Sequence, residues 1–70
     1  MATTERALVS FKVRGYVSGE PWILVEWISG DDVFKGGTLG FDLPEGTPLD
    51  QAEELAEFMR KRITHLARTE

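Results

Sequence analysis

The sequence contains no cysteine, which excludes disulfide bonds, thiolate catalysis and cysteine-ligated metal sites. It has a single histidine, His65, and a histidine that acts as a base or a metal ligand needs partner side chains on its own face. The nearest hydroxyl along the chain, that of Thr64, falls on a different face of the helix that this region predicts. We therefore expect no catalytic residue, no metal site and no cofactor, and we expect that the protein is not an enzyme.

Long apolar runs and an excess of positive charge are also missing. No hydrophobic run approaches the roughly 20 residues that span a bilayer, so we expect no membrane association. Residues 1–6 lack the basic and apolar stretches of a signal peptide, which favours a cytoplasmic location. Lys and Arg number 8 against 12 Asp and Glu, and the resulting net charge of −4 gives no overall attraction to nucleic acid.

The remaining composition is that of one small globular domain. With 70 residues, 41% of them hydrophobic and 29% charged, the chain can bury a single small core. Such a core leaves about 3 to 5 kcal/mol of net stability, so small domains often gain further burial by oligomerisation. We predict a disordered segment over residues 1–6 and a single domain over residues 7–70.

The stretch from Thr47 to about Arg68 predicts one amphipathic helix. Thr47 can cap the first turn, and Pro48 suits the first helical position because its missing N–H costs nothing there. At about 100° per residue, the apolar side chains form a core-facing stripe about 120° wide. Its members are Leu49, Ala52, Leu55, Ala56, Met59, Ile63 and Leu66. Phe58 lies off this stripe, and we expect it to pack against a sheet edge or a neighbouring subunit.

Three strands are predicted before the helix, because apolar residues alternate with polar ones along much of this region. They run from Ala7 to Ser18, from Trp22 to Ile28 and from about Phe34 to Leu43, with glycine-containing turns between them. The predicted fold class is therefore α+β, a three-stranded antiparallel meander with one C-terminal helix packed on one face (βββα). The sheet residues expected in the core are Val9, Phe11, Val13, Val17, Ile23, Val25, Trp27, Leu39, Phe41 and Leu43.

Cross-strand pairs predict the register at both turns. A three-residue first loop, residues 19–21, keeps apolar and charged side chains on separate faces, whereas a two-residue loop mixes them. The pairs predicted across the first loop are Val17 with Ile23, Val13 with Trp27, and Arg14 with Glu26. The pairs predicted across the second turn are Ile23 with Phe41, Val25 with Leu39, and Trp27 with Gly37.

The outer face of this sheet, on the side away from the helix, is predicted to be unusually apolar. A solvated face normally alternates to polar residues, and this one carries Trp22, Leu24 and Ile28. Large exposed apolar patches usually mark partner sites, and two-fold homodimers are the commonest oligomers. We therefore predict a self-associating protein-interaction module, most simply a homodimer, with an unidentified protein as the other candidate partner. The predicted interface residues are Tyr16, Trp22, Leu24, Ile28, Arg14, Glu26 and Gly40.

Two alternatives remain open for this face. The long side chains of Lys12 and Arg14, together with residues 1–6, can shield the patch in a monomer. The same two cations, with Lys35 nearby, can instead contact phosphates of a nucleic acid. The predicted order of three strands and a helix resembles the arm-type DNA-binding domains of some transposon integrases, and that resemblance implies a sheet face that enters the major groove.

Overall fold

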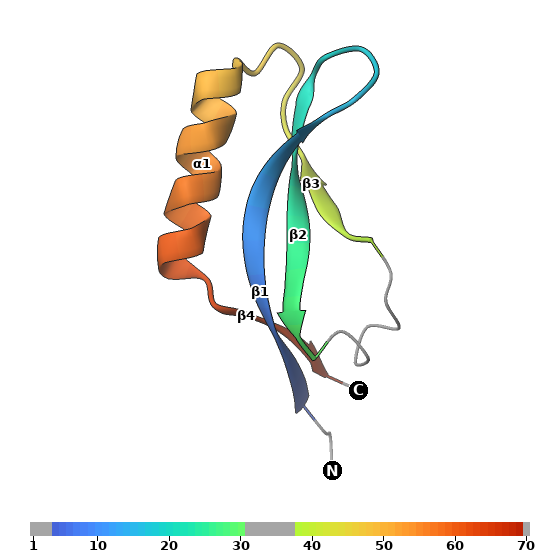
Figure 1. Cartoon of the computed structure of the whole chain (residues 1–70), viewed down its shortest axis with the longest axis vertical. Helices are drawn as coiled ribbons and strands as arrows, with labels where there is room; N and C mark the ends of the chain where they lie inside the picture. Colours follow the sequence, from blue (N-terminus) through green and yellow to red (C-terminus); the bar gives the residue numbers. More distant parts are fainter. Residues whose placement is uncertain (1–3, 31–37, 70) are drawn as a thin grey trace.

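The described residues form a four-stranded antiparallel sheet with one helix packed against it, which confirms the predicted α+β class (Figure 1). The computed structural model describes residues 4–30 and 38–69. Its elements are β1 (Thr4–Gly15), β2 (Pro21–Ser29), β3 (Gly40–Asp42), α1 (Leu49–Arg62) and β4 (His65–Thr69). The strand order β3-β2-β1-β4 contains the predicted meander and adds a fourth strand beside β1. Within the described residues, no helix is both long and apolar enough to cross a membrane.

The predicted helix is confirmed over Leu49–Arg62, but it ends earlier than expected. Ile63 has extended backbone angles, with φ −121° and ψ 125°, and its N–H donates to the Met59 carbonyl at 2.7 Å. Ile63 and the following Thr64 are both β-branched, and such side chains favour extended backbone over helix. The chain therefore leaves the helix at this point and turns toward the sheet.

The start of the helix also differs from the prediction. The residue before the first helical one is Pro48, and no side chain caps the first turn. The Thr47 hydroxyl donates instead to the Pro44 carbonyl at 2.6 Å, which closes the turn that precedes the helix. The capping role predicted for Thr47 is therefore wrong, because its hydroxyl is used by this earlier turn.

The residues predicted as the end of the helix form β4. This strand pairs antiparallel with residues 4–8 of β1. Leu66 fits both a helical and an alternating pattern, and in β4 it lies opposite Ala7 and packs against the core. The helix prediction is wrong beyond Arg62, because the edge of β1 supplies backbone partners that an isolated sequence pattern cannot reveal. This pairing also makes β1 begin at Thr4, ahead of the start predicted for the domain.

The first hairpin has a longer loop than predicted. The loop is closed by the Tyr16 N–H, which donates to the Glu20 carbonyl at 2.9 Å. Arg14 consequently lies opposite Trp22, and its predicted pairing with Glu26 is wrong. The predicted pairs of Val17 with Ile23 and of Val13 with Trp27 are wrong for the same reason, because Ile23 lies opposite Val13. An exposed cross-strand ion pair contributes only about 0.2 to 1 kcal/mol, which is too little to override the geometry of the loop. The predicted register between β1 and β2 differs from the observed one by an even number of residues. The paired side chains therefore keep the faces predicted for them.

The second predicted register is confirmed where the structure describes it. Ile23 pairs with Phe41, and the Val25 N–H donates to the Leu39 carbonyl at 2.9 Å. β3 has only 3 residues, so it is much shorter than the strand that the sequence predicts. The predicted positions Phe34, Lys35 and Gly37 lie outside the described residues.

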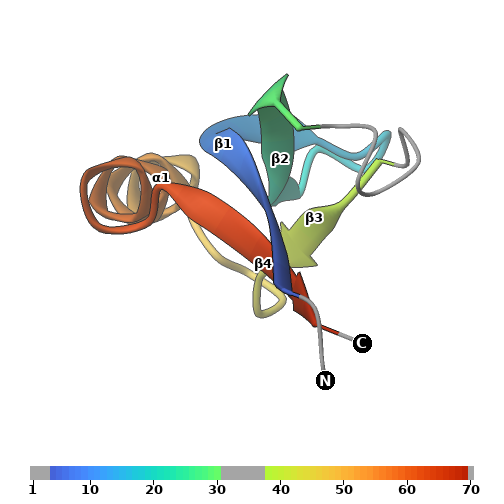
Figure 2. The same cartoon turned by 90° about the horizontal axis from the view of Figure 1, so that it is seen from below.

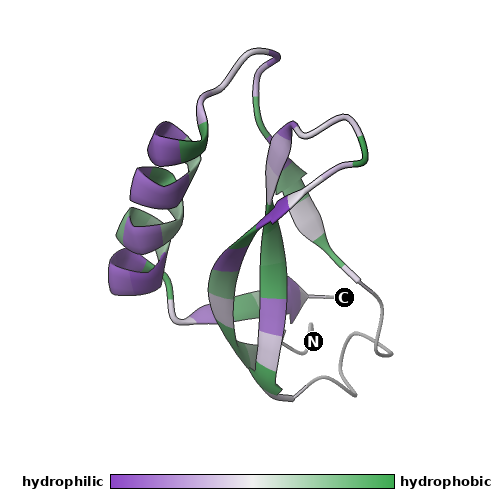
Figure 3. Cartoon of the chain, turned by 45° about the horizontal axis from the view of Figure 1, so that its top comes forward, coloured by the Kyte–Doolittle hydropathy of each residue, from purple (hydrophilic) through white to green (hydrophobic). Residues whose placement is uncertain are grey.

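The core lies between α1 and the inner face of β1 and β2. In Figure 3 the hydrophilic side of α1 faces away from the sheet, and apolar residues line its sheet side. Ala52 and Ala56 have small side chains, which let the helix backbone approach the strands closely. The buried residues are Ala7, Val9, Phe11, Ile23, Val25, Ala52, Ala56 and Met59. Val13, Trp27, Leu43 and Leu66 pack against them and are half-buried.

Part of the predicted core is exposed, and at β3 the reason is that one helix covers only about two strands. A helix is about 10 to 12 Å across and strands are about 4.8 Å apart. α1 packs on β1 and β2, and β3 lies on the far side of β2 (Figure 2). The Phe41 ring on β3 is therefore partly exposed, although its centroid is 6.3 Å from that of Phe11. The predicted core residues found exposed are Val17, Leu39, Phe41, Leu49, Leu55 and Ile63.

Beyond residue 8, the second edge of β1 is covered by the end of α1 and the residues that follow it. The Arg60 guanidinium donates to the Phe11 carbonyl at 2.6 Å, and the Val9 N–H donates to the Thr64 carbonyl at 3.0 Å. An open strand edge invites pairing with other chains. These two contacts occupy the middle of the β1 edge and help to close it.

Ala56→Leu is expected to destabilise the protein, because Ala56 is 0% exposed and faces the sheet. Extra methylenes in a packed core cost about 1 to 3 kcal/mol. The control is Leu55→Ala at a neighbouring side chain that is 41% exposed, for which we expect a smaller loss. Chemical denaturation followed by circular dichroism measures both changes. A larger loss for Leu55→Ala would contradict the orientation of α1.

Candidate functional site

The outer face of the sheet is formed by the even-numbered residues of β1 and β3 and by Trp22, Leu24 and Glu26 of β2, which point away from α1. Cross-strand pairing arranges their side chains in rows that run across the three strands. The first row holds Arg14, Trp22 and Asp42, and the second holds Lys12, Leu24 and Gly40. Each row therefore places a cation on β1 and a large apolar side chain on β2.

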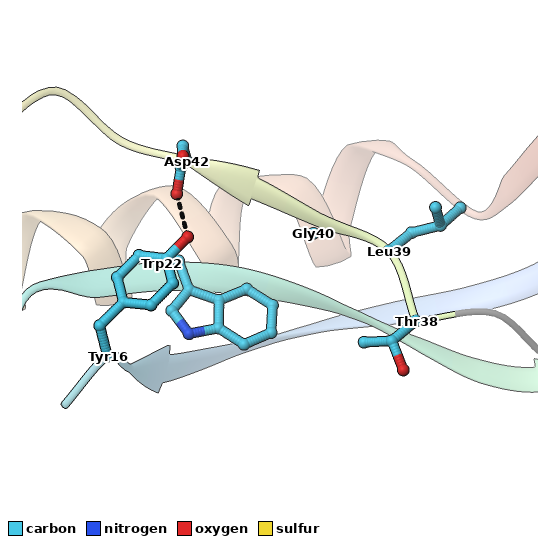
Figure 4. Close-up of a pocket in the computed structure, with 6 residues that line it drawn as sticks. All are labelled: Tyr16, Trp22, Thr38, Leu39, Gly40 and Asp42. Atoms are coloured by element: carbon cyan, nitrogen blue, oxygen red, sulfur yellow. Dashed lines mark hydrogen bonds between the residues drawn. The ribbon is translucent and has the colours of Figure 1, made fainter.

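Trp22 contacts both β3 and the loop that joins β1 to β2 (Figure 4). Its ring stacks on the Tyr16 ring, with centroids 5.8 Å apart and an interplanar angle of 25°. A Cβ on Gly40 would lie 2.9 Å from the Ile23 carbonyl oxygen and would overlap the Trp22 ring. The absence of a side chain at Gly40 therefore allows the indole to lie close to β3. These contacts hold the Trp22 ring in one position on the outer face.

Tyr16 is tied to β3 by a side-chain hydrogen bond. Its hydroxyl donates to the Asp42 carboxylate at Oδ1 (Figure 4). This hydrogen bond, a smaller contribution from desolvation and the negative charge of Asp42 together raise the pKa of Tyr16. Sequence reasoning placed Tyr16 in the interface but missed its partner Asp42. The predicted loop was too short, and it set Tyr16 opposite the wrong part of β2, away from the row of Asp42.

An open hollow of about 420 Å³ lies beside this aromatic pair. Its lining residues are Tyr16, Trp22, Thr38, Leu39, Gly40 and Asp42. No cationic side chain lines it, and only Oδ1 of the Asp42 carboxylate accepts a hydrogen bond within the described part of the chain. Aromatic faces beside a carboxylate favour a positively charged group that also has apolar or planar surface.

The other predicted interface residues lie around this cluster. Leu24 is half-buried in the row next to Trp22. Ile28 is 59% exposed near the end of β2. Glu26 is also exposed, opposite Ser10 on β1. The structure therefore places Trp22 and Leu24 on one face, leaves Ile28 exposed at the register irregularity of β2, and splits the predicted charge pair.

The cations of the nucleic-acid alternative are only partly described. Lys12 and Arg14 are exposed on β1, and Lys35 lies outside the described residues. The same sheet face carries the carboxylates of Glu26 and Asp42. Arg6, farther back on β1 and opposite Ala67, is a third exposed cation, so the described part of this face has one more cation than carboxylates.

Two side chains outside the outer face were singled out by the sequence. Phe58 is exposed on α1, where the Arg62 guanidinium carbon lies 5.5 Å from its ring centroid. Within the described residues it does not pack against a sheet edge, so that part of the expectation is wrong. His65 lies in β4 opposite Leu8, and its Nδ1 is 2.8 Å from the Thr64 hydroxyl oxygen.

The described residues contain no group of three or more His, Asp or Glu side chains that could hold a metal ion. Comparison of the chain with protein-family models, curated proteins and solved structures finds no match. The outer face combines an aromatic cluster, an apolar strip and charges of both signs.

In the folded protein, the pKa of Tyr16 is expected to lie above its ordinary value of 10.0 and to fall in Asp42→Asn. Because the folded pKa is raised, the Tyr16–Asp42 contact stabilises the fold below the ordinary tyrosine pKa. This contribution is lost as the pH rises through the folded value. Tyr16 is the chain's single tyrosine, so the absorbance of tyrosinate reports on it alone. An unchanged Tyr16 pKa in Asp42→Asn would contradict the assigned hydrogen bond, and Glu45→Gln serves as the control.

Proposed function

We propose that the protein is a small protein-interaction module that forms a homodimer through the outer face of its sheet and has no catalytic role of its own. The observation that carries this proposal is the apolar strip of Trp22 and Leu24 on β2, with exposed Ile28 toward the end of the strand, which no helix covers within the described residues. Tyr16 flanks the strip and fixes Trp22. Large, rigid apolar side chains near the centre of a patch supply most of the binding energy of an interface.

The small size of the core favours further burial on this face. Among the described residues, the buried set contains three alanines and few large side chains, so this part of the chain removes little apolar surface from water. Full burial of a side chain such as Leu24 contributes about 1.5 to 3 kcal/mol. A second copy that covers the strip would therefore add a substantial fraction of the stability typical of so small a domain.

A two-fold axis parallel to β2 fits the rows on this face. Such an axis stacks β2 on β2 and places β1 of one copy over β3 of the other. Leu24 would then meet its symmetry mate at the centre of the interface. Lys12 and Arg14 on β1 would lie over β3, which carries Asp42. The cations on β1 are thus complementary to Asp42 on β3, while the same axis brings Glu26 on β2 near its own symmetry mate, in the row next to Leu24.

This charge distribution favours self-association over nucleic-acid binding. Strong binding to duplex DNA normally neutralises about six or more phosphates. The described part of the outer face offers three cations, Arg6, Lys12 and Arg14, and it also carries Glu26 and Asp42. The whole chain has a net charge of −4. Nucleic-acid binding is therefore less well supported than homodimer formation.

Leu24→Glu is expected to convert the homodimer into a monomer, because it places a charge at the centre of the apolar strip. Light scattering on a sizing column, run over about a hundredfold range of concentration, measures the molar mass. The wild type should give about twice the 7.9 kDa of one chain, and Leu24→Glu should give the mass of one chain. The helical circular dichroism should persist in the variant, because Leu24 faces away from α1.

Leu55→Glu is the matched control for this experiment. It introduces the same charge at a partly exposed leucine on α1, away from the outer sheet face. We expect this variant to remain a dimer. A wild type that has the mass of one chain at every concentration would overturn the proposed self-association.

A further inference from the structure

The hollow beside Tyr16 and Trp22 combines the features of a site for a positively charged side chain. Two aromatic rings present electron-rich faces, and the Asp42 carboxylate supplies a full negative charge. Asp42 makes no ion pair within the described part of the chain, and its Oδ1 is held by the Tyr16 hydroxyl. The carboxylate is thus fixed in place with its second oxygen available to a further donor.

Arg14 is a suitable donor on the same face. It lies in the row of Trp22 and Asp42, but on the opposite side of β2 from the carboxylate. Two strand spacings separate β1 from β3, which is about 10 Å. Within the described residues, Arg14 makes no hydrogen bond or ion pair, and its side chain is exposed.

We infer that the hollow of each copy receives Arg14 of the second copy in the homodimer. This inference rests on the proposed self-association through the outer face. A two-fold axis parallel to β2 maps each row onto itself, so Arg14 of one copy lies over Asp42 of the other. The contact occurs twice in the dimer, once on each side of the apolar strip.

Arginine suits this hollow better than lysine does. The planar guanidinium can stack on an aromatic ring and can donate two parallel hydrogen bonds to a carboxylate. Lys12 lies one row away. In the dimer it would lie over Gly40 of the second copy, which offers no side chain. The inference therefore distinguishes two neighbouring cations on the same strand. Arg14 sets the orientation of the two copies, and Lys12 makes only a general electrostatic contribution.

The test is a double-mutant cycle on dimer dissociation with Arg14→Gln and Asp42→Asn. Asp42→Asn keeps an oxygen acceptor for the Tyr16 hydroxyl. Each single variant is expected to raise the dimer dissociation constant by about tenfold or more, and the double variant should be no weaker than either single one. Lys12→Gln combined with Asp42→Asn is the matched control, and its effects should be additive. Sedimentation equilibrium measures all of these constants.

The outcomes separate this inference from the proposed function. A dimeric wild type in which the Arg14 and Asp42 effects are additive overturns the inference and leaves the homodimer standing. A monomeric wild type overturns both. The same cycle, repeated for unfolding in the monomeric Leu24→Glu background, should show no coupling between the two sites. Coupling of equal size in that monomer would mean that Arg14 and Asp42 interact within one chain, and it would also overturn the inference.

Discussion

The packing of α1 on β1 and β2 is the constraint on which the rest of the structure depends. Ala52 and Ala56 bring the helix close to the inner face, where Phe11 and Ile23 are the largest fully buried side chains. A single helix is only wide enough to cover about two strands. The inner side of β3 and the whole outer face are therefore left outside this contact. The width of α1 therefore sets how much apolar surface of the sheet remains available to a partner.

β1 connects the two halves of the sheet. Its later residues pair with β2, its first residues pair with β4, and a register shift separates Leu8 from Val9. Gly30, just after β2, lies close to β1 at this point: a Cβ there would be 3.0 Å from the Ala7 Cα. Arg60 and Thr64 then cover the edge that β4 leaves open. The fold thereby protects a long strand against pairing with other chains, so association through a sheet face is favoured over association through this edge.

The outer face gains its organisation from residues that are distant in sequence. Tyr16 comes from the first loop, Trp22 from β2, and Asp42 and Gly40 from β3. Their contacts fix a tryptophan that would otherwise be a mobile apolar side chain. A fixed aromatic ring loses less conformational entropy when a partner binds. The proposed homodimer and the proposed role of Arg14 both depend on this preorganised cluster.

The sequence by itself determined which strand side chains share a face, the second register and most of the helix, because these depend on periodicity and short-range turns. Only the tertiary structure decided that Leu66 belongs to a strand. Its position fits both the helical and the alternating strand periodicity, and backbone pairing with the edge of β1 favours the strand. The five-residue first loop likewise brought Tyr16 within reach of Asp42. Such pairings join residues far apart in the chain, and local patterns carry no information about them.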